Sequence, residues 1–133
     1  MKGSYILIIE NKINQNISIG KLGNIFFKKG FYIYVGSAMN SLEGRITRHK
    51  RSEKKNHWHI DYLLKKTNTV DIYYKQSENK EECKIAKEFS KEFEIIPSFG
   101  CSDCRCNSHL FFGKLKDANK IISNLKLKMF KKN

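Results

Sequence analysis

The order of apolar and polar side chains along this chain predicts alternating strands and helices. Within residues 4–10 both the odd and the even positions are largely apolar, which indicates a central strand covered on both faces. Two short apolar segments flank a connection that carries Gly20 and Gly23, and such a connection favours a small hairpin. The strands expected from these patterns lie at residues 4–10, 17–19, 25–27, 31–38, 69–76 and 108–112.

Apolar residues spaced three and four apart predict helices between these strands. The first begins at Leu42, because Ser41 is a residue type that caps helix N-termini. In a later helix Glu82 extends an apolar stripe, an unusual place for a solvated carboxylate. The remaining helices are expected at residues 57–64, 81–93 and 117–130, with a loop over 97–107.

The charge of the chain narrows the choice of partner. Among 133 residues, 26 are Lys or Arg and 13 are Asp or Glu, which gives a formal net charge of +13. Such a positive small domain favours a polyanion, and nucleic acid is the first candidate. The alternative is that the lysines only maintain solubility or reflect a biased genome.

The length and apolar content fit one domain over residues 1–133. The apolar runs are much shorter than the ~20 residues that a membrane span needs. The start of the chain leads directly into a strand-like segment without a cleavage site for a signal peptide. We therefore expect a cytoplasmic protein that does not associate with membranes.

The segment most informative about chemistry is the strand Tyr34-Val35-Gly36, which ends in a tight Gly-Ser turn. A short basic helix with Arg45 and His49 follows at once. Arginine stays charged and presents several donors in a planar fork, a geometry suited to phosphodiesters. A tyrosine strand beside such a helix therefore points to phosphodiester chemistry.

Together with Gly3-Ser4-Tyr5, these residues resemble the GIY-YIG nuclease superfamily. Tyr34-Val35-Gly36 matches the second motif with Val in place of Ile, and Arg45 follows Gly36 by nine positions. Ser4 departs from the usual aliphatic residue. The two tyrosine motifs also lie farther apart than usual, so the hairpin is expected to be an insertion.

Three further blocks are similar to one branch of that superfamily, the Uri-type endonucleases. They are the segment His57-Trp58-His59-Ile60-Asp61-Tyr62-Leu63-Leu64, the pair Glu82-Cys83, and the cysteine-rich segment 101–110. The resemblance extends over nearly the whole chain. It implies an α/β (α+β) fold: a small mixed or antiparallel sheet with the inserted hairpin, flanked by about four helices.

The resemblance also implies a catalytic set of Tyr5, Tyr34, Arg45, His49 and Glu82. A tyrosine would relay or accept the proton of the attacking water, and His49 would orient it or transfer a proton. Arg45 would bind the scissile phosphate. Glu82 would hold the divalent cofactor, Mg²⁺ or Mn²⁺. Taken singly, each residue also has a structural explanation, since tyrosine favours strands and a lone arginine is more often solvated.

The densest positive charge lies in residues 45–55, which we expect to follow a nucleic-acid backbone. Contacts of this kind are insensitive to sequence and sensitive to salt. The residues expected to make them are Arg48, Lys50, Arg51, Lys54 and Lys55.

In a reducing compartment the four cysteines are not expected to form disulfides. The roles that stay open for them are metal binding, reactivity and packing. Cys101, Cys104, Cys106 and His109 offer four soft ligands in nine residues, and Cys83 could replace one of them. A structural zinc site is therefore one of the alternatives. Such close spacing leaves little chain to surround a tetrahedral ion, and Cys83 also suits simple packing.

Three more polar residues, His57, His59 and Asp61, accompany Trp58. The pattern allows a hydrogen-bonded layer under the cleft, or groups that support the site residues or contact phosphate. The sequence does not decide between these.

The sequence thus predicts a metal-dependent endonuclease that hydrolyses DNA phosphodiester bonds, directed by structure or weakly by sequence. The alternative is a non-catalytic module that binds DNA or RNA and holds a structural zinc. A third class, a purely structural protein, would show no salt-dependent affinity for nucleic acid. Nothing in the chain indicates an obligate protein partner.

Overall fold

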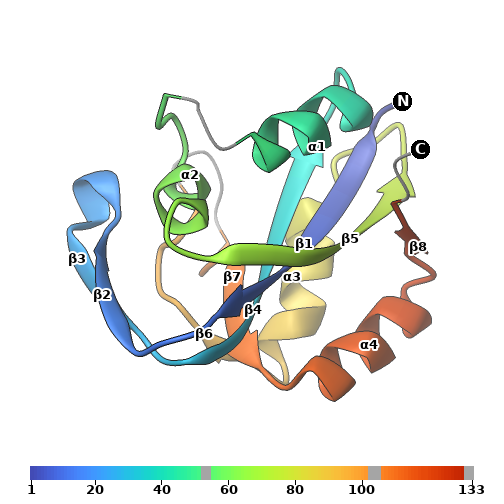
Figure 1. Cartoon of the computed structure of the whole chain (residues 1–133). Helices are drawn as coiled ribbons and strands as arrows, with labels where there is room; N and C mark the ends of the chain where they lie inside the picture. Colours follow the sequence, from blue (N-terminus) through green and yellow to red (C-terminus); the bar gives the residue numbers. More distant parts are fainter. Residues whose placement is uncertain (52–54, 102–105, 131–133) are drawn as a thin grey trace.

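The computed structural model describes residues 1–51, 55–101 and 106–130, and an antiparallel sheet organises them (Figure 1). The sheet has six strands in the order β6-β7-β4-β1-β5-β8, and β2 and β3 form a separate pair. The expected fold class is confirmed. The strands are β1 (Gly3–Asn11), β2 (Gln15–Ser18), β3 (Asn24–Phe27), β4 (Gly30–Ala38), β5 (Asn68–Gln76), β6 (Glu94–Ile95), β7 (Leu110–Gly113) and β8 (Lys128–Met129). The helices are α1 (Leu42–Lys50), α2 (His59–Leu64), α3 (Glu82–Ser90), α4 (Leu115–Asn124) and a short 3₁₀ helix, η1 (Gly20–Leu22).

The central strand β1 is covered on both faces, as the sequence predicts. Leu7 and Ile9 belong to a core that includes residues of α1, α2 and the β2–β3 hairpin. Ile6 and Ile8 belong to a second core, formed with α3 and α4. Burial of each such side chain contributes about 1.5 to 3 kcal/mol. The sheet therefore lies between two helical layers (Figure 1).

The hairpin is part of the first core. Ile17, Ile19 and Phe27 are 5% exposed or less, and they pack with the central strands and α2. Gly20 has a φ of 45°, which favours glycine, and a side chain there would meet the ring of Tyr62. The predicted hairpin is confirmed.

Helix α1 begins where the sequence predicts. The Ser41 hydroxyl accepts a hydrogen bond from the Gly44 N–H at 3.0 Å, which caps the first turn. Leu42 and Ile46 are fully buried and anchor the helix on the sheet. None of the helices in the described ranges combines the length and the apolar composition needed to cross a membrane.

The last predicted helix, 117–130, is wrong at its C-terminal end. Helix α4 ends at Asn124, and Lys126 adopts a left-handed φ of 59°. The N–H groups of Lys126 and Leu127 bond back to the carbonyls of Ser123 and Ile122, which is the Schellman arrangement that ends helices. The chain then pairs with β5 as the edge strand β8. This strand is not predicted because the apolar residues keep a helical spacing beyond the end of α4.

Two other helices are shorter than predicted, and β6 is missed as well as β8. Helix α2 begins at His59 rather than at residue 57, and α3 ends at Ser90 rather than at 93. The two-residue strand β6 pairs with β7. A strand this short has no periodicity to detect.

The β1–β4 pairing brings the ring of Tyr5 against Gly36. The two residues are cross-strand partners, and a Cβ added to Gly36 would collide with the ring and hydroxyl of Tyr5. Tyr5 is 1% exposed, and its ring and hydroxyl already occupy the position that such a Cβ would take. Glycine is needed here because of the close approach, since no positive φ is recorded for Gly36.

Gly36→Ala is therefore expected to destabilise the fold by about 1 to 3 kcal/mol, the usual cost of overpacking. Gly44→Ala is the matched control, because a gain in helix propensity of about 1 kcal/mol offsets a mild contact with Ser41. Urea unfolding of both variants measures the difference. Equal stability of the two variants would contradict the steric explanation.

Candidate active site

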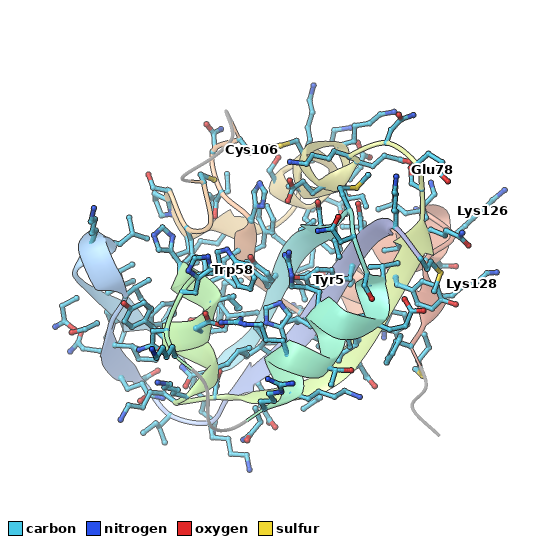
Figure 2. All side chains as sticks on the ribbon, turned by 90° about the horizontal axis from the view of Figure 1, so that it is seen from above. Tyr5, Trp58, Glu78, Cys106, Lys126 and Lys128 are labelled. Atoms are coloured by element: carbon cyan, nitrogen blue, oxygen red, sulfur yellow. A yellow bond between two sulfur atoms is a disulfide. The ribbon has the colours of Figure 1, made fainter. Side chains whose placement is uncertain are left out.

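A cavity of about 290 Å³ lies where the C-terminal end of β4 meets α1, α2 and the start of α3. Four of the five residues expected to be catalytic line it: Tyr5, Tyr34, Arg45 and Glu82. Viewed from above, Tyr5 and Trp58 lie towards the middle of the view, whereas Glu78, Lys126 and Lys128 lie at its edge (Figure 2). The other lining residues are Gly36, Ser37, Met39, Asn40, Trp58, His59, Lys80, Gly100 and His109.

The fifth expected residue, His49, contacts Tyr5 instead of lining the cavity. The Tyr5 hydroxyl lies 2.6 Å from Nε2 of His49, and both side chains are buried. Burial raises the pKa of Tyr5 above its usual value, although the charge and hydrogen bonding of Arg45 oppose the change. The phenol is therefore protonated at neutral pH, and its hydroxyl lies within hydrogen-bond distance of a histidine ring nitrogen.

Tyr34 stands beside Tyr5 on the same face of the sheet, because Leu7 pairs with Tyr34 and Tyr5 with Gly36. The two tyrosine ring centroids are 6.4 Å apart. Burial also raises the pKa of Tyr34 well above its usual value. Both phenols thus present neutral hydroxyl groups to the site.

Arg45 extends from α1 towards the end of β4. Its Nη1 donates to the carbonyl of Ser37 at 2.9 Å, and its guanidinium carbon lies 4.3 Å from the centroid of the Trp58 ring. Among the ion pairs between described residues, none includes Arg45. Its charge is thus available to an anion in the cavity.

Arg48 is held differently, in a bidentate pair with Asp61. The nitrogens Nη1 and Nη2 donate to the two carboxylate oxygens at 2.9 and 3.0 Å. Asp61 is fully buried, and it also accepts the N–H groups of His57 and Trp58. The expected phosphate contact of Arg48 therefore competes with an internal carboxylate.

Glu82 and His109 face each other across the cavity wall. Oε2 of Glu82 lies 3.6 Å from Nδ1 of His109, which also lies 3.1 Å from the Val35 carbonyl. Burial lowers the pKa of His109, and the charge of Glu82 opposes this only in part. A neutral His109 therefore donates its Nδ1–H to the Val35 carbonyl, and Nε2 keeps its lone pair.

His59 and Lys80 complete the polar lining. The N–H of Gly100 donates to Nδ1 of His59 at 2.8 Å, so Nε2 carries the proton of the neutral ring. Burial lowers the pKa of His59, which favours that neutral form. Lys80 is not among the site residues predicted from the sequence. Its position two residues before Glu82 is the only signal, and it is weak in a chain so rich in lysine.

The remaining basic candidates lie near the end of α1. Lys50 and Arg51 line a different hollow, together with Lys65, and Lys50 lies 5.4 Å from the ring of Phe130. Lys55 is exposed, and its carbonyl accepts from Arg48. Lys54 lies outside the described residues. Lys50, Arg51 and Lys55 are thus not among the residues that line the cavity.

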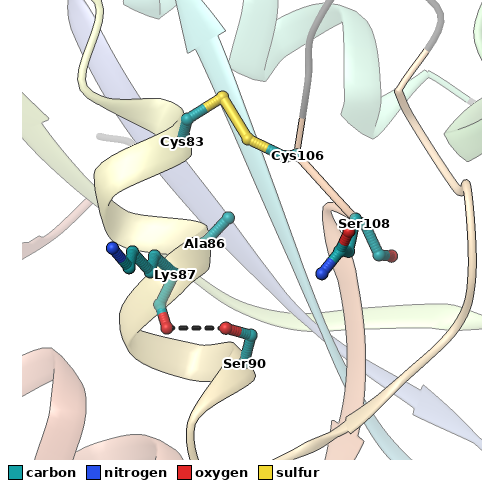
Figure 3. A pocket seen from close by; sticks show the side chains of 7 residues that line it. Cys83, Ala86, Lys87, Ser90, Cys106 and Ser108 are labelled. Carbon is teal, nitrogen blue, oxygen red and sulfur yellow. Dashed lines mark hydrogen bonds between the residues drawn. A yellow bond between two sulfur atoms is a disulfide. The ribbon is translucent and has the colours of Figure 1, made fainter.

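The sulfur atoms of Cys83 and Cys106 lie at disulfide distance, with their Cα atoms 6.0 Å apart (Figure 3). This pairing corrects the expectation that the cysteines stay unpaired. It links α3 to the segment before β7. Beside the pair lies a second hollow of about 410 Å³, which has few titratable groups.

Cys83, Cys106 and His109 also form a candidate metal site. Their ligand atoms lie within 4.8 Å of one another, and Nε2 of His109 is 3.9 Å from the sulfur of Cys83. Cys101 is not part of this cluster, and its thiol faces the carbonyl of Phe99. Cys104 lies outside the described residues. The structure thus gathers three of the five residues expected for zinc.

The fold and the site define an antiparallel α/β domain with a cavity lined by tyrosine, arginine and glutamate. The chain belongs to a family described as "Domain of unknown function DUF123", whose model matches residues 4–131. That description assigns no activity. Among curated proteins and among solved structures, the comparisons found no match.

Asp61→Asn is expected to destabilise the fold by about 2 kcal/mol at pH 7, because it weakens charged hydrogen bonds to a buried group. Burial alone would raise the pKa of Asp61, but hydrogen bonds from Arg48, Trp58 and His57 place it below the usual value. A lowered pKa means that the stabilisation exists above about pH 4 and is lost as the pH falls through the folded-state pKa. Denaturant unfolding at pH 7 and below pH 4 measures this. A wild-type advantage that persists in acid would contradict it.

Proposed function

We propose that this protein is a metal-dependent endonuclease of the GIY-YIG type that hydrolyses phosphodiester bonds in DNA. One observation carries the proposal: Tyr5, Tyr34, Arg45 and Glu82 come from four separate elements and line one cavity. Hydrolysis of a phosphodiester needs a site for the phosphate charge, a route for the proton of water, and help for the leaving oxygen. These four residues and His49 supply groups for each need.

Arg45 is the phosphate-binding group of this proposal. Its guanidinium lines the cavity, and Arg45 is absent from the ion pairs of the described chain. Charged donors fixed before the reaction stabilise the developing charge without reorganisation. Lys80, on the same cavity wall, supplies a second positive charge.

Tyr5 and His49 are the proton-transfer pair. The hydroxyl of Tyr5 faces Nε2 of His49 at 2.6 Å, a distance at which the phenol donates to a neutral imidazole. As Tyr5 takes the proton of the attacking water, its own proton passes to His49. This relay avoids a free phenolate, which burial disfavours.

The carboxylate of Glu82 fits a hard divalent cation. It is 20% exposed, it lines the cavity, and oxygen is the ligand type that Mg²⁺ and Mn²⁺ prefer. A bound cation would supply charge stabilisation for the scissile phosphate. The ring of His109, whose Nδ1 lies 3.6 Å from Oε2 of Glu82, is neutral and adds no competing positive charge there.

The substrate class follows from charge. A net charge of +13 and the basic end of α1 favour a long polyanion, and contacts of this kind read backbone shape rather than base sequence. We therefore propose structure-directed or weakly specific cleavage. The similarity to the Uri-type branch supports DNA over RNA.

Arg45→Ala tests the proposal directly. Cleavage of branched, nicked, single-stranded and duplex oligonucleotides, with Mg²⁺, Mn²⁺ or a chelator, is expected to fall about 10² to 10³-fold in the variant. Binding, measured by electrophoretic mobility shift, is expected to change little, because many other cations contact the backbone.

The competing function is a nucleic-acid binding module without turnover. It predicts that the wild-type protein cleaves none of these substrates and that Arg45→Ala weakens binding. Glu81→Gln is the matched control, because Glu81 bonds Ser77 and pairs with Lys75 instead of lining the cavity. It should leave cleavage and binding unchanged.

We also propose that Cys83, Cys106 and His109 hold zinc when the two sulfurs are reduced. Two thiolates and an imidazole form a soft donor set, and the inferred Nδ1–H of His109 donates to a backbone carbonyl, which is how ligating histidines are usually oriented. Oxidation of the same sulfurs to a disulfide excludes the metal. The site would stabilise the junction between α3 and β7.

Zinc content of reduced protein tests this. One zinc per chain is expected by elemental analysis, with loss in Cys83→Ser and retention in Cys101→Ser, whose thiol lies outside the cluster. Zinc-free reduced protein, or equal loss in both variants, would contradict the assignment.

A further inference from the structure

Trp58 packs against the first core just before α2, and its ring also lies between two arginines of α1, a contact that core packing alone does not require. Its ring contacts Arg45, which lines the cavity, and Arg48, which is paired with Asp61. The two guanidinium carbons lie 4.3 and 4.4 Å from the ring centroid. Tryptophan is the aromatic side chain that attracts cations most strongly.

Arg45 needs such a support. Its long side chain rotates about several bonds, and its hydrogen bonding to the Ser37 carbonyl and to Tyr5 engages only part of its fork of donors. A guanidinium stacked on a ring is restrained in plane as well as in position. Trp58 is therefore a further restraint on the orientation of Arg45, and it acts on the plane of the guanidinium.

Trp58 itself is fixed by the buried carboxylate. Asp61 accepts the main-chain N–H of Trp58 at 2.9 Å, and Arg48 holds Asp61 through two hydrogen bonds. The contacts form a closed circuit from α1 through Arg48, Asp61 and Trp58 back to Arg45. Each member is held by at least two others or by the helix that carries it.

We propose that Trp58 is a positioning residue, whose electron-rich ring fixes the Arg45 guanidinium with its remaining donors facing the cavity. This inference rests on the proposed nuclease function, and Asp61 acts through Trp58 in the same circuit. The role predicts an effect on turnover rather than on substrate affinity, because the orientation of Arg45 matters most as charge develops on the phosphate.

The sequence offers a sharp test, because Trp58 is the single tryptophan of the chain. Biosynthetic incorporation of tryptophan with one, two or three ring fluorines withdraws electron density from this ring alone and barely alters its shape. The kcat for cleavage is expected to fall stepwise with the number of fluorines, by about 3- to 30-fold in total, with KM nearly constant. Trp58→Phe should retain more activity than Trp58→Leu.

Two controls separate positioning from packing. In an Arg45→Ala background, the fluorine series should change the residual cleavage less than about twofold, because the partner of the ring is gone. Phe130→Leu, which removes the ring beside Lys50, should leave kcat unchanged. A flat fluorine series in the otherwise wild-type protein would overturn the inference, even if Trp58→Leu is inactive or unfolded.

Failure of the nuclease proposal can be distinguished from failure of the positioning role of Trp58. If the wild-type protein cleaves no substrate, ¹⁵N relaxation of the Arg45 side-chain Nε–H replaces kcat as the measurement. An ordered Arg45 that becomes more mobile along the fluorine series supports the inference without reference to activity. An Arg45 of unchanged mobility overturns it.

Discussion

The close approach of Tyr5 to Gly36 is the constraint on which the site depends. The ring of a buried tyrosine occupies the space that a side chain on the neighbouring strand would fill. This contact fixes the phenol at the end of two central strands, and α1 begins only a few residues later. His49 can therefore reach the hydroxyl from the helix, and Arg45 can reach the end of β4. A shift of Tyr5 would separate groups that come from three elements.

A division of charge follows from this arrangement. A fully buried aspartate requires a partner, and Arg48 provides it from the same helix that carries Arg45. Because Asp61 is satisfied, Arg45 keeps its charge for the cavity. On the opposite wall, burial favours a neutral His109, so this ring places no competing cation beside Glu82. The cavity thus keeps one anionic and at least one cationic group apart, which suits both a phosphate and a hard metal ion.

Much of the fold could be predicted from the sequence because it depends on local patterns. The doubly apolar strand β1, the Gly-bearing hairpin and the Ser41 cap each have a short-range cause. The end of α4 could not be predicted, because the left-handed turn at Lys126 interrupts an apolar spacing that continues beyond it.

The candidate site was predictable only in part, and mainly through resemblance. Tyr5, Tyr34, Arg45 and Glu82 line one cavity, as expected from their resemblance to the motif order of the GIY-YIG superfamily. The approach of Cys83 to Cys106, and the stacking of Trp58 on two arginines, join segments far apart in the chain. Such contacts depend on how loops fold onto the sheet, and no periodicity encodes them.

The hairpin between the two tyrosine strands has a consequence for the design of smaller versions of this domain. Ile17, Ile19 and Phe27 are buried with residues of α2 and the central sheet, so the hairpin is structural cover rather than an appendage. A chain that joined Asn11 directly to Gly30 would leave this flank of the core open to water. Any minimised scaffold would therefore have to replace those apolar surfaces, because it would otherwise expose an aggregation-prone apolar patch beside α2.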